Sequence, residues 1–239
     1  MPVYCITGTN RGLGLEFVRQ LAQDPANTIL ATTRPSADTT DLRAVASDNT
    51  HVLPCDTADV ESIRAFAKEA VRVLGGRKID HLINNAGLNQ GPAGESSLNV
   101  DAKHIAVQLA INVVGPAKVV QFLLEAGALA TAVRVLNLTS GLSSMAITVG
   151  GSPRYSVGYS ISKAGLNMLA IHQSADLRAK LDGAVVVVID PGWVKTRMGG
   201  DGAMLEPDVS ISGMLKVLHA LEDKDNGKFY SYDGSTVEW

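Results

Sequence analysis

Short runs of β-branched and aliphatic residues alternate along the chain with longer segments in which apolar residues recur three and four positions apart. Leu15, Val18, Leu21 and Ala22 show the second pattern, which is typical of one face of a helix. The run at 185–189 is apolar at every position, as in a strand that is covered on both faces. Strand-like runs occur at residues 3–6, 28–32, 51–53, 81–83, 133–138, 185–189 and 229–232.

The alternation of strand and helix patterns predicts an α/β fold, because successive βαβ units place parallel strands in one sheet between layers of helices. We expect a doubly wound, seven-stranded, mainly parallel sheet with helices on both faces. Polar stretches rich in Gly, Pro and Ser interrupt the pattern, but each is followed by more of the same rhythm. They are interpreted as loops, and residues 1–239 as a single domain.

Composition excludes several classes of protein. Hydrophobic residues make up 46% of the 239 residues and charged residues 19%, which suits a sizeable core and not a disordered chain. Lys and Arg number 21 against 24 Asp and Glu, giving a formal net charge of −3. The chain therefore has no overall basic field with which to bind nucleic acid or anionic lipid.

The chain begins without the pattern of a signal peptide, and its longest unbroken apolar run, 184–189, is far shorter than the ~18 residues of a membrane-spanning helix. Cys5 and Cys55 lie in apolar strand-like runs, where small buried thiols are expected instead of a disulfide or metal ligands. The five histidines show no paired metal-ligand spacing. These features predict a soluble, cytoplasmic protein without a metal site or a membrane partner.

A glycine-rich turn separates the first strand from an amphipathic helix, and it reads Thr7-Gly8-Thr9-Asn10-Arg11-Gly12-Leu13-Gly14. Glycine permits positive φ angles and close approach of the backbone to a ligand. The N-terminus of the following helix offers unpaired N–H groups to a phosphate. The pattern indicates a pyrophosphate-binding turn, and a plain turn is the alternative.

The spacing Gly-x-x-x-Gly-x-Gly after a threonine resembles the short-chain dehydrogenase/reductase family, whose other motifs follow in order. Asn84-Asn85-Ala86-Gly87 comes after the fourth strand and Pro191-Gly192 after the sixth. Asp56, after the third strand, is similar to the acidic residue that contacts the adenine in that family. The resemblance spans essentially the whole chain and implies a Rossmann fold that binds NADP(H). The positions that it assigns to the cofactor are Gly8, Asn10, Arg11, Gly12, Leu13, Gly14, Arg34, Asp56, Thr57, Asn85, Ala86, Gly87, Tyr159, Lys163, Pro191, Gly192, Val194 and Thr196.

Tyr159 and Lys163 are four residues apart at the start of a predicted helix, so they share one face of it. A phenol with an ordinary pKa of about 10 is deprotonated with difficulty, but a neighbouring ammonium and the nicotinamide charge lower that pKa. The pair resembles the Tyr-x-x-x-Lys of the family, which implies that Tyr159 is the general acid and that Lys163 tunes it and binds the nicotinamide ribose. The alternative is a surface tyrosine and a solvated lysine.

Ser140 ends the fifth strand and is similar to the family serine that hydrogen-bonds the substrate oxygen. It precedes Tyr159 by 19 residues, which leaves Thr139, Ser143 and Ser144 as alternatives. Asn112 resembles the family's helix asparagine, which holds a water beside the lysine. The alternative is an asparagine inside a helix that is bonded to backbone.

The second strand leads into Thr33-Arg34-Pro35, and no carboxylate appears before Asp38. A carboxylate there accepts hydrogen bonds from the ribose of NAD and repels a 2′-phosphate. Arg34 instead brings a guanidinium, which suits phosphate oxygens, and Arg11 lies where NADP-preferring relatives often carry a second basic residue. We therefore expect NADPH to be preferred, with solvated surface arginines as the alternative.

Within the family the chain resembles the carbonyl-reductase-like branch, which includes sniffer and C-factor proteins, and it is similar to fungal ketoreductases. The resemblance implies an NADPH-dependent reductase of a small-molecule ketone or aldehyde, with catalytic residues Asn112, Ser140, Tyr159 and Lys163. One alternative is a dinucleotide-binding signalling or sensor protein with little turnover. Epimerase or dehalogenase chemistry on the same fold fits less well, because both the glycine turn and the four catalytic positions are complete.

The loops at 88–98, 142–155 and 193–211 are expected to form the substrate pocket, since such loops vary with substrate. Trp193, Met198 and Met204 indicate an apolar wall, or packing within a lid. The apolar-rich helices expected at 101–126 and 159–181 match a pair that commonly packs between subunits in the family, which implies a homodimer or a tetramer.

Overall fold

The computed structural model describes residues 1–91, 94–150 and 156–239, and it contains one parallel sheet of seven strands. The strand order is β3-β2-β1-β4-β5-β6-β7, and every neighbouring pair is parallel. The strands are β1 (Val3–Ile6), β2 (Thr28–Thr33), β3 (Thr50–Pro54), β4 (Ile79–Asn84), β5 (Leu129–Leu138), β6 (Val185–Asp190) and β7 (Phe229–Ser231). The predicted doubly wound Rossmann fold is confirmed.

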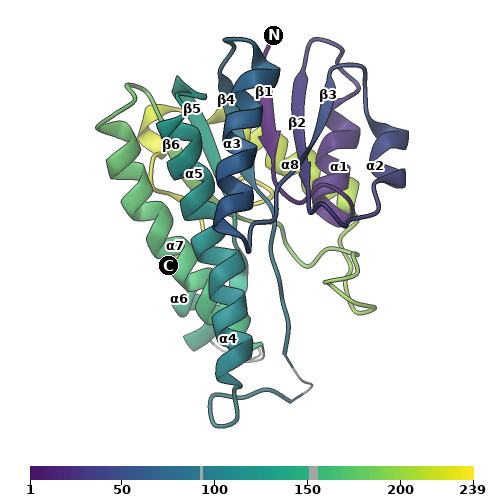
Figure 1. Cartoon of the computed structure of the whole chain (residues 1–239). Helices are drawn as coiled ribbons and strands as arrows, with labels where there is room; N and C mark the ends of the chain where they lie inside the picture. The colour runs from purple at the N-terminus through teal and green to yellow at the C-terminus, as the bar shows by residue number, and fades with distance from the viewer. Residues whose placement is uncertain (92–93, 151–155) are drawn as a thin grey trace.

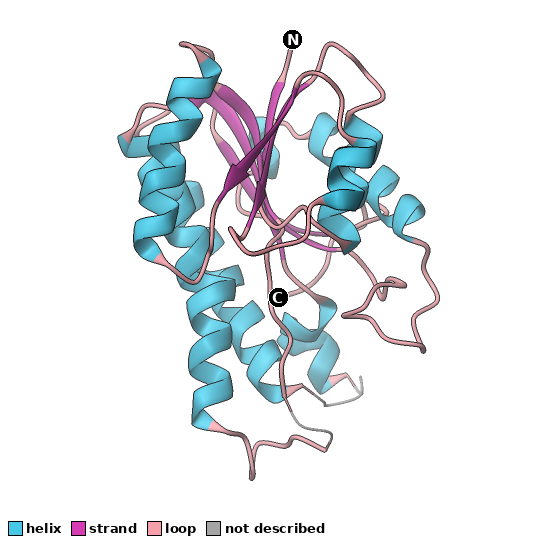
Figure 2. Ribbon diagram, turned by 45° about the vertical axis from the view of Figure 1, so that its right-hand side comes forward, coloured by secondary structure: helices cyan, strands magenta, loops and turns pink. Residues whose placement is uncertain are grey.

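The helices connect the strands and cover both faces of the sheet, as Figures 1 and 2 show. They are α1 (Gly12–Leu21), α2 (Thr40–Val45), α3 (Val60–Leu74), α4 (Ala102–Leu109), α5 (Gly115–Glu125), α6 (Met145–Val149), α7 (Val157–Arg178) and α8 (Pro207–Ala220). Local signals set several of their ends. The Asp59 carboxylate accepts a hydrogen bond from the Glu61 amide at the start of α3, and Gly75 ends that helix with a left-handed φ of 58°.

Two hydrophobic clusters, one on each face, hold the layers together. Phe66 of α3, Leu123 of α5 and Leu177 of α7 belong to the first cluster. Phe17 of α1 and Met214 of α8 belong to the second. Because β6 contributes side chains to both clusters, Val185 to Ile189 are all buried, as their unbroken apolar run predicts.

A π-helical turn, η1 (Ala110–Val114), joins α4 to α5. Pro116 follows this turn and has no N–H to donate, so regular α-helical bonding is interrupted there. The continuous segment Ala102–Glu125 is long and apolar enough to cross a membrane by length and composition alone. This was not expected from the sequence, because the longest unbroken apolar run of the chain, 184–189, is short. It packs in this fold against α7 and α3, and less than half of its most apolar stretch is buried.

Cys5 and Cys55 are buried free thiols, as their positions in apolar runs predict. Burial raises the pKa of Cys5 well above its ordinary value and that of Cys55 to about 12. Both thiols therefore stay protonated in the folded protein at neutral pH.

Candidate active site

The candidate site lies where four neighbouring strands end. β1, β4, β5 and β6 are adjacent in the sheet and parallel, so the residues that follow them meet at one edge. These residues are the glycine turn after β1, the Asn85–Gly87 turn after β4, Ser140 after β5 and Pro191–Gly192 after β6. Open α/β sheets bind ligands at this edge, near the point where the strand order reverses.

The glycine turn leaves little room for side chains at Gly8 and Gly14. Gly8 and Gly12 have φ angles of 72° and 58°, which favour glycine. A Cβ on Gly14 would lie 2.1 Å from the Gly8 carbonyl oxygen, and one on Gly8 would lie 3.0 Å from Ala86 Cα. Among the described residues, no side chain caps the N-terminus of α1. This uncovered helix end and the bare backbone around it fit a pyrophosphate.

Hydrogen bonds from Thr7 and Asn85 join the glycine turn to the turn after β4. The Asn85 Nδ2 donates to the carbonyl oxygens of Thr7 at 2.8 Å and Gly8 at 3.0 Å. The Thr7 hydroxyl accepts in return from the amides of Asn85 at 3.1 Å and Ala86 at 3.0 Å. Thr7 belongs to the motif in the sequence but was not predicted as a site residue, since its spacing does not show that its hydroxyl binds the turn after β4.

Other positions assigned to the cofactor surround this centre. Thr196 Cγ2 lies 3.8 Å from where a Cβ on Gly12 would be, so the loop after β6 passes beside the glycine turn. Asp56 follows β3 and accepts a hydrogen bond from the Ala58 amide at 3.0 Å. Arg11 and Arg34 are both exposed, in the segments that follow β1 and β2. The remaining positions are Thr57 and Val194, which are buried, and Asn10, Leu13 and Pro191, which are partly buried.

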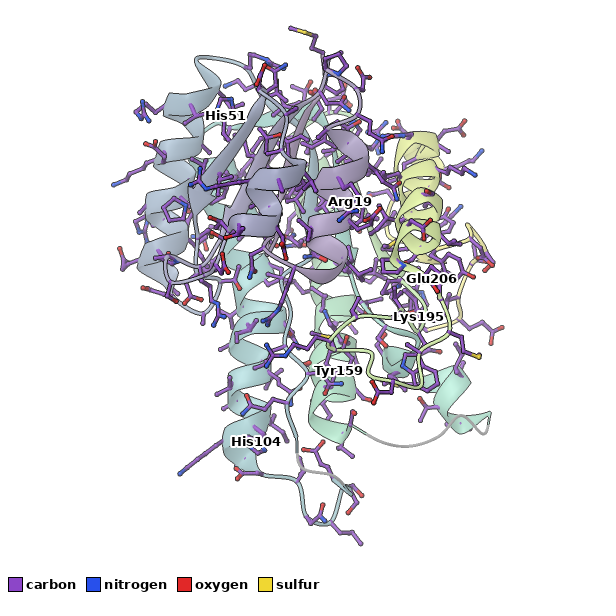
Figure 3. The ribbon with its side chains drawn as sticks, turned by 90° about the vertical axis from the view of Figure 1, so that its right-hand side faces the viewer. Arg19, His51, His104, Tyr159, Lys195 and Glu206 are labelled. Atoms are coloured by element: carbon purple, nitrogen blue, oxygen red, sulfur yellow. The ribbon has the colours of Figure 1, made fainter. Side chains whose placement is uncertain are left out.

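Tyr159 and Lys163 lie on one face near the start of α7, and Figure 3 labels Tyr159 there. The Lys163 ammonium is buried, donates a hydrogen bond to the Leu138 carbonyl at 2.6 Å and lies 5.7 Å from the Tyr159 ring centre. Burial lowers the pKa of Lys163 to about 7. Desolvation and then the charge of Asp190 raise the pKa of Tyr159, while a hydrogen bond with the Ser140 side chain lowers it.

Ser140 is the hydroxyl residue of this turn that remains partly exposed. Its alternatives Thr139, Ser143 and Ser144 are all buried and engaged with other groups. Thr139 and Ser143 form a network with Asn167 of α7, whose amide oxygen lies 2.6 Å from the Thr139 hydroxyl. The geometry therefore favours Ser140 over the three alternatives. Asn167 was missed in the sequence, because a polar residue in a helix gives no sign of being buried.

Asn112 lies in the π-helical turn and is fully buried. Its side chain bonds the backbone of Leu88 in both directions, as donor and as acceptor, at 2.8 Å each. Its Nδ2 also donates to the Ser162 hydroxyl at 2.8 Å. Asn112 thus forms hydrogen bonds to backbone, as expected for the alternative to a water-holding asparagine. These bonds fix the loop after the Asn85–Gly87 turn. A Cβ on Gly87 would lie 3.4 Å from Asn112 Oδ1 and 3.5 Å from Lys163 Nζ, so these groups are close together.

The loops expected to bind substrate are described only in part, since residues 92–93 and 151–155 lie outside the described ranges. In the loop after β6, the Trp193 indole donates to the Gly199 carbonyl at 2.8 Å. Trp193, Met198 and Met204 are all exposed there. Throughout the described parts of the chain, no group of three or more His, Cys, Asp or Glu side chains is arranged to hold a metal ion.

Comparisons with known proteins agree with this geometry. Residues 2–203 match the family profile described as short chain dehydrogenase. The C-signal protein of Myxococcus xanthus is 37% identical over 177 residues, which cover 74% of this chain and all of that protein. Solved structures that cover the whole of both chains include an NADPH-bound carbonyl reductase from chicken fatty liver, with 31% identity and a TM-score of 0.90, and the carbonyl reductase Sniffer of Drosophila melanogaster, with 27% identity and a TM-score of 0.88.

Proposed function

Because the chain belongs to the short-chain dehydrogenase family, we propose that it is an NADPH-dependent carbonyl reductase that converts a ketone or aldehyde to an alcohol. The observation that carries this proposal is the convergence of Ser140, Tyr159 and Lys163 beside the glycine turn, where no described side chain caps the N-terminus of α1. The similarity to an NADPH-bound carbonyl reductase over the whole chain supports it.

In the proposed reaction, Tyr159 donates a proton to the carbonyl oxygen, and the Ser140 hydroxyl hydrogen-bonds the same oxygen. Lys163 holds the nicotinamide ribose and, when charged, favours the phenolate that forms on Tyr159. NADPH supplies the hydride. Asn112 holds the Leu88 backbone and so fixes the segment next to Lys163.

A panel of ketones, aldehydes and quinones tests the proposal, with NADPH oxidation followed by absorbance. We expect at least one class of carbonyl to be reduced by the wild-type protein. Binding of NADPH without turnover of any carbonyl would instead support a dinucleotide-binding signalling or sensor protein.

Coenzyme choice gives a sharper prediction. Because Arg34 and Arg11 carry exposed charges in the segments after β2 and β1, we expect kcat/KM to favour NADPH over NADH by at least about tenfold, which corresponds to about 1.4 kcal/mol. Replacing Arg34 with Asp should erase or reverse the preference, mainly through the KM for the coenzyme. Arg43→Asp on α2 is the matched control and should leave the ratio unchanged. An unchanged ratio in Arg34→Asp would show that the assigned phosphate site is wrong.

We also propose that residues 1–239 form one domain and that the protein is a homodimer in the cytoplasm. Val107 and Val114, on the Ala102–Glu125 segment, and Ile161 and Met168, on α7, are exposed apolar side chains on neighbouring helices. Burial of such side chains against a second copy is favourable. We expect light scattering at micromolar concentration to give about twice the chain mass of 25.1 kDa. A value equal to the chain mass would reject the dimer, and Val107→Lys together with Met168→Lys should produce that value.

A further inference from the structure

Asp190 is a carboxylate at the centre of the site that neither the sequence motifs nor the proposed reaction uses. It ends β6, between β5 and β7 in the sheet. On one side, the Thr139 amide continues the β5–β6 ladder by donating to the Ile189 carbonyl at 2.8 Å. On the other side, the Tyr232 amide donates to the Asp190 carbonyl at 2.8 Å. The backbone of Asp190 is therefore held from both sides.

The Asp190 side chain lies between the turn after Ser140 and the turn after Pro191. The Gly192 amide donates to Asp190 Oδ1 at 3.2 Å. A Cβ on Gly141 would lie 3.2 Å from Asp190 Oδ2, so the glycine after Ser140 allows the carboxylate to approach this turn closely. Desolvation raises the pKa of Asp190, and the amides of Gly141 and Gly192 act in the opposite direction by stabilising the charged form.

We propose that Asp190 is a positioning residue for the proposed reduction: its carboxylate, bonded by the Gly192 amide and in close contact with Gly141, ties the Ser140 turn to the Pro191–Gly192 turn. This inference rests on the proposed function for its kinetic test, but the ionisation of Tyr159 can be measured without it. Asp190 reaches the reaction through Tyr159 and Ser140 and is not itself a catalytic residue.

The charged and polar groups near Tyr159 determine whether removal of the Asp190 charge raises or lowers the pKa of the Tyr159 phenol. Lys163 lies on the same helix, Ser140 faces the phenol from the end of β5, and Asp190 acts on it from the end of β6. The Glu95 carboxylate, in the loop after β4, accepts a hydrogen bond from the Gly158 amide at 3.0 Å, and the neutral Gln108 of α4 also lies beside Gly158.

A negative charge near a phenol opposes its ionisation, so Asp190 raises the pKa of Tyr159. Removal of that charge should lower the pKa, and Tyr159 should then lose its proton at a lower pH. A side chain that only supported the fold would change the rate without moving this pH.

The variant Asp190→Asn removes the charge and keeps an oxygen that can accept from the two amides. We expect the alkaline limb of the pH profile for ketone reduction to move to lower pH by at least about half a unit, with the limb for alcohol oxidation moving in the same direction. Asp190→Ala also removes the acceptor, so we expect the same shift with a further loss in kcat. Asp182→Asn, at an exposed position in the turn between α7 and β6, is the matched control and should move neither limb.

Phenolate absorbance provides a readout that does not need turnover. Titration of wild type against Tyr159→Phe isolates the ionisation of Tyr159, and in Asp190→Asn this step should occur at lower pH. If Asp190→Asn does not fold, Asp190→Ser carries the same expectation. If Asp190→Asn leaves both the alkaline limb of the pH profile and the pH of Tyr159 ionisation unchanged, the inference is overturned, even if the enzyme is active. A wild-type protein that reduces no carbonyl would instead refute the proposed function, while the phenolate titration would still test Asp190.

Discussion

Replacement of Tyr159 by Phe is expected to lower kcat for carbonyl reduction by about 1000-fold or more, because a positioned general acid commonly contributes a factor of this order. The ring stays in place on α7, while the proton donor is lost. Affinity for NADPH should change little, since the glycine turn and Lys163 are untouched. Steady-state kinetics and a fluorescence titration with NADPH measure the two quantities separately.

Tyr230→Phe is the matched control for this substitution. Tyr230 lies on β7, and its hydroxyl donates to the Asp225 carboxylate at 2.8 Å. This hydrogen bond involves neither Ser140 nor Lys163. Its loss should cost some stability and leave kcat near the wild-type value. Full activity in Tyr159→Phe would contradict the proposed mechanism, and equal losses in both variants would indicate a general effect on folding.

The second large effect is expected from Gly14→Ala. The new Cβ would lie 2.1 Å from the Gly8 carbonyl oxygen and 2.6 Å from Asn85 Nδ2, so the glycine turn or the Asn85 side chain has to move. A forced rearrangement of this kind costs about 1–3 kcal/mol. If most of that cost falls on the cofactor site, affinity for NADPH drops by roughly 10- to 100-fold. Isothermal titration calorimetry measures it directly.

Gly165→Ala tests whether this effect is local. Gly165 lies inside α7, where a new Cβ would first meet the Val113 side chain at 3.3 Å, and a side chain can yield more easily than backbone. We expect NADPH affinity near the wild-type value in this variant. Wild-type affinity in Gly14→Ala would show that the turn does not bind the pyrophosphate.

The sequence predicts the strands well where apolar residues are continuous. The bounds of β1 agree with the prediction, whereas β5 begins at Leu129, four residues before its predicted start. The added residues include Thr131 and Ala132, which are exposed, so no apolar run marks them. The helix expected at 101–126 is interrupted by a π-helical turn. This turn was not predicted, because the local spacing of apolar residues does not show how Pro116 is accommodated.

The candidate site was predictable where a motif combines a fixed spacing with a position at a strand end. Gly8, Asn85 and Ser140 meet those conditions, and the structure brings them to one edge of the sheet together with Tyr159 of α7. Asp190 did not stand out, because its approach to Gly141 joins two segments that are far apart in the chain. Contacts of this kind arise only when the sheet forms, and no local pattern encodes them.

The two buried thiols provide a chemical probe of local unfolding in the native protein. A thiol reagent can modify Cys5 of β1 or Cys55, beside β3, only after the sheet separates from the α3 and α5 layer that covers them. In a labelling experiment under native conditions, the extent of modification over time therefore reports how often this part of the molecule opens. The same assay ranks Gly14→Ala, Tyr159→Phe and Asp190→Asn by their effect on the fold, without reference to any substrate.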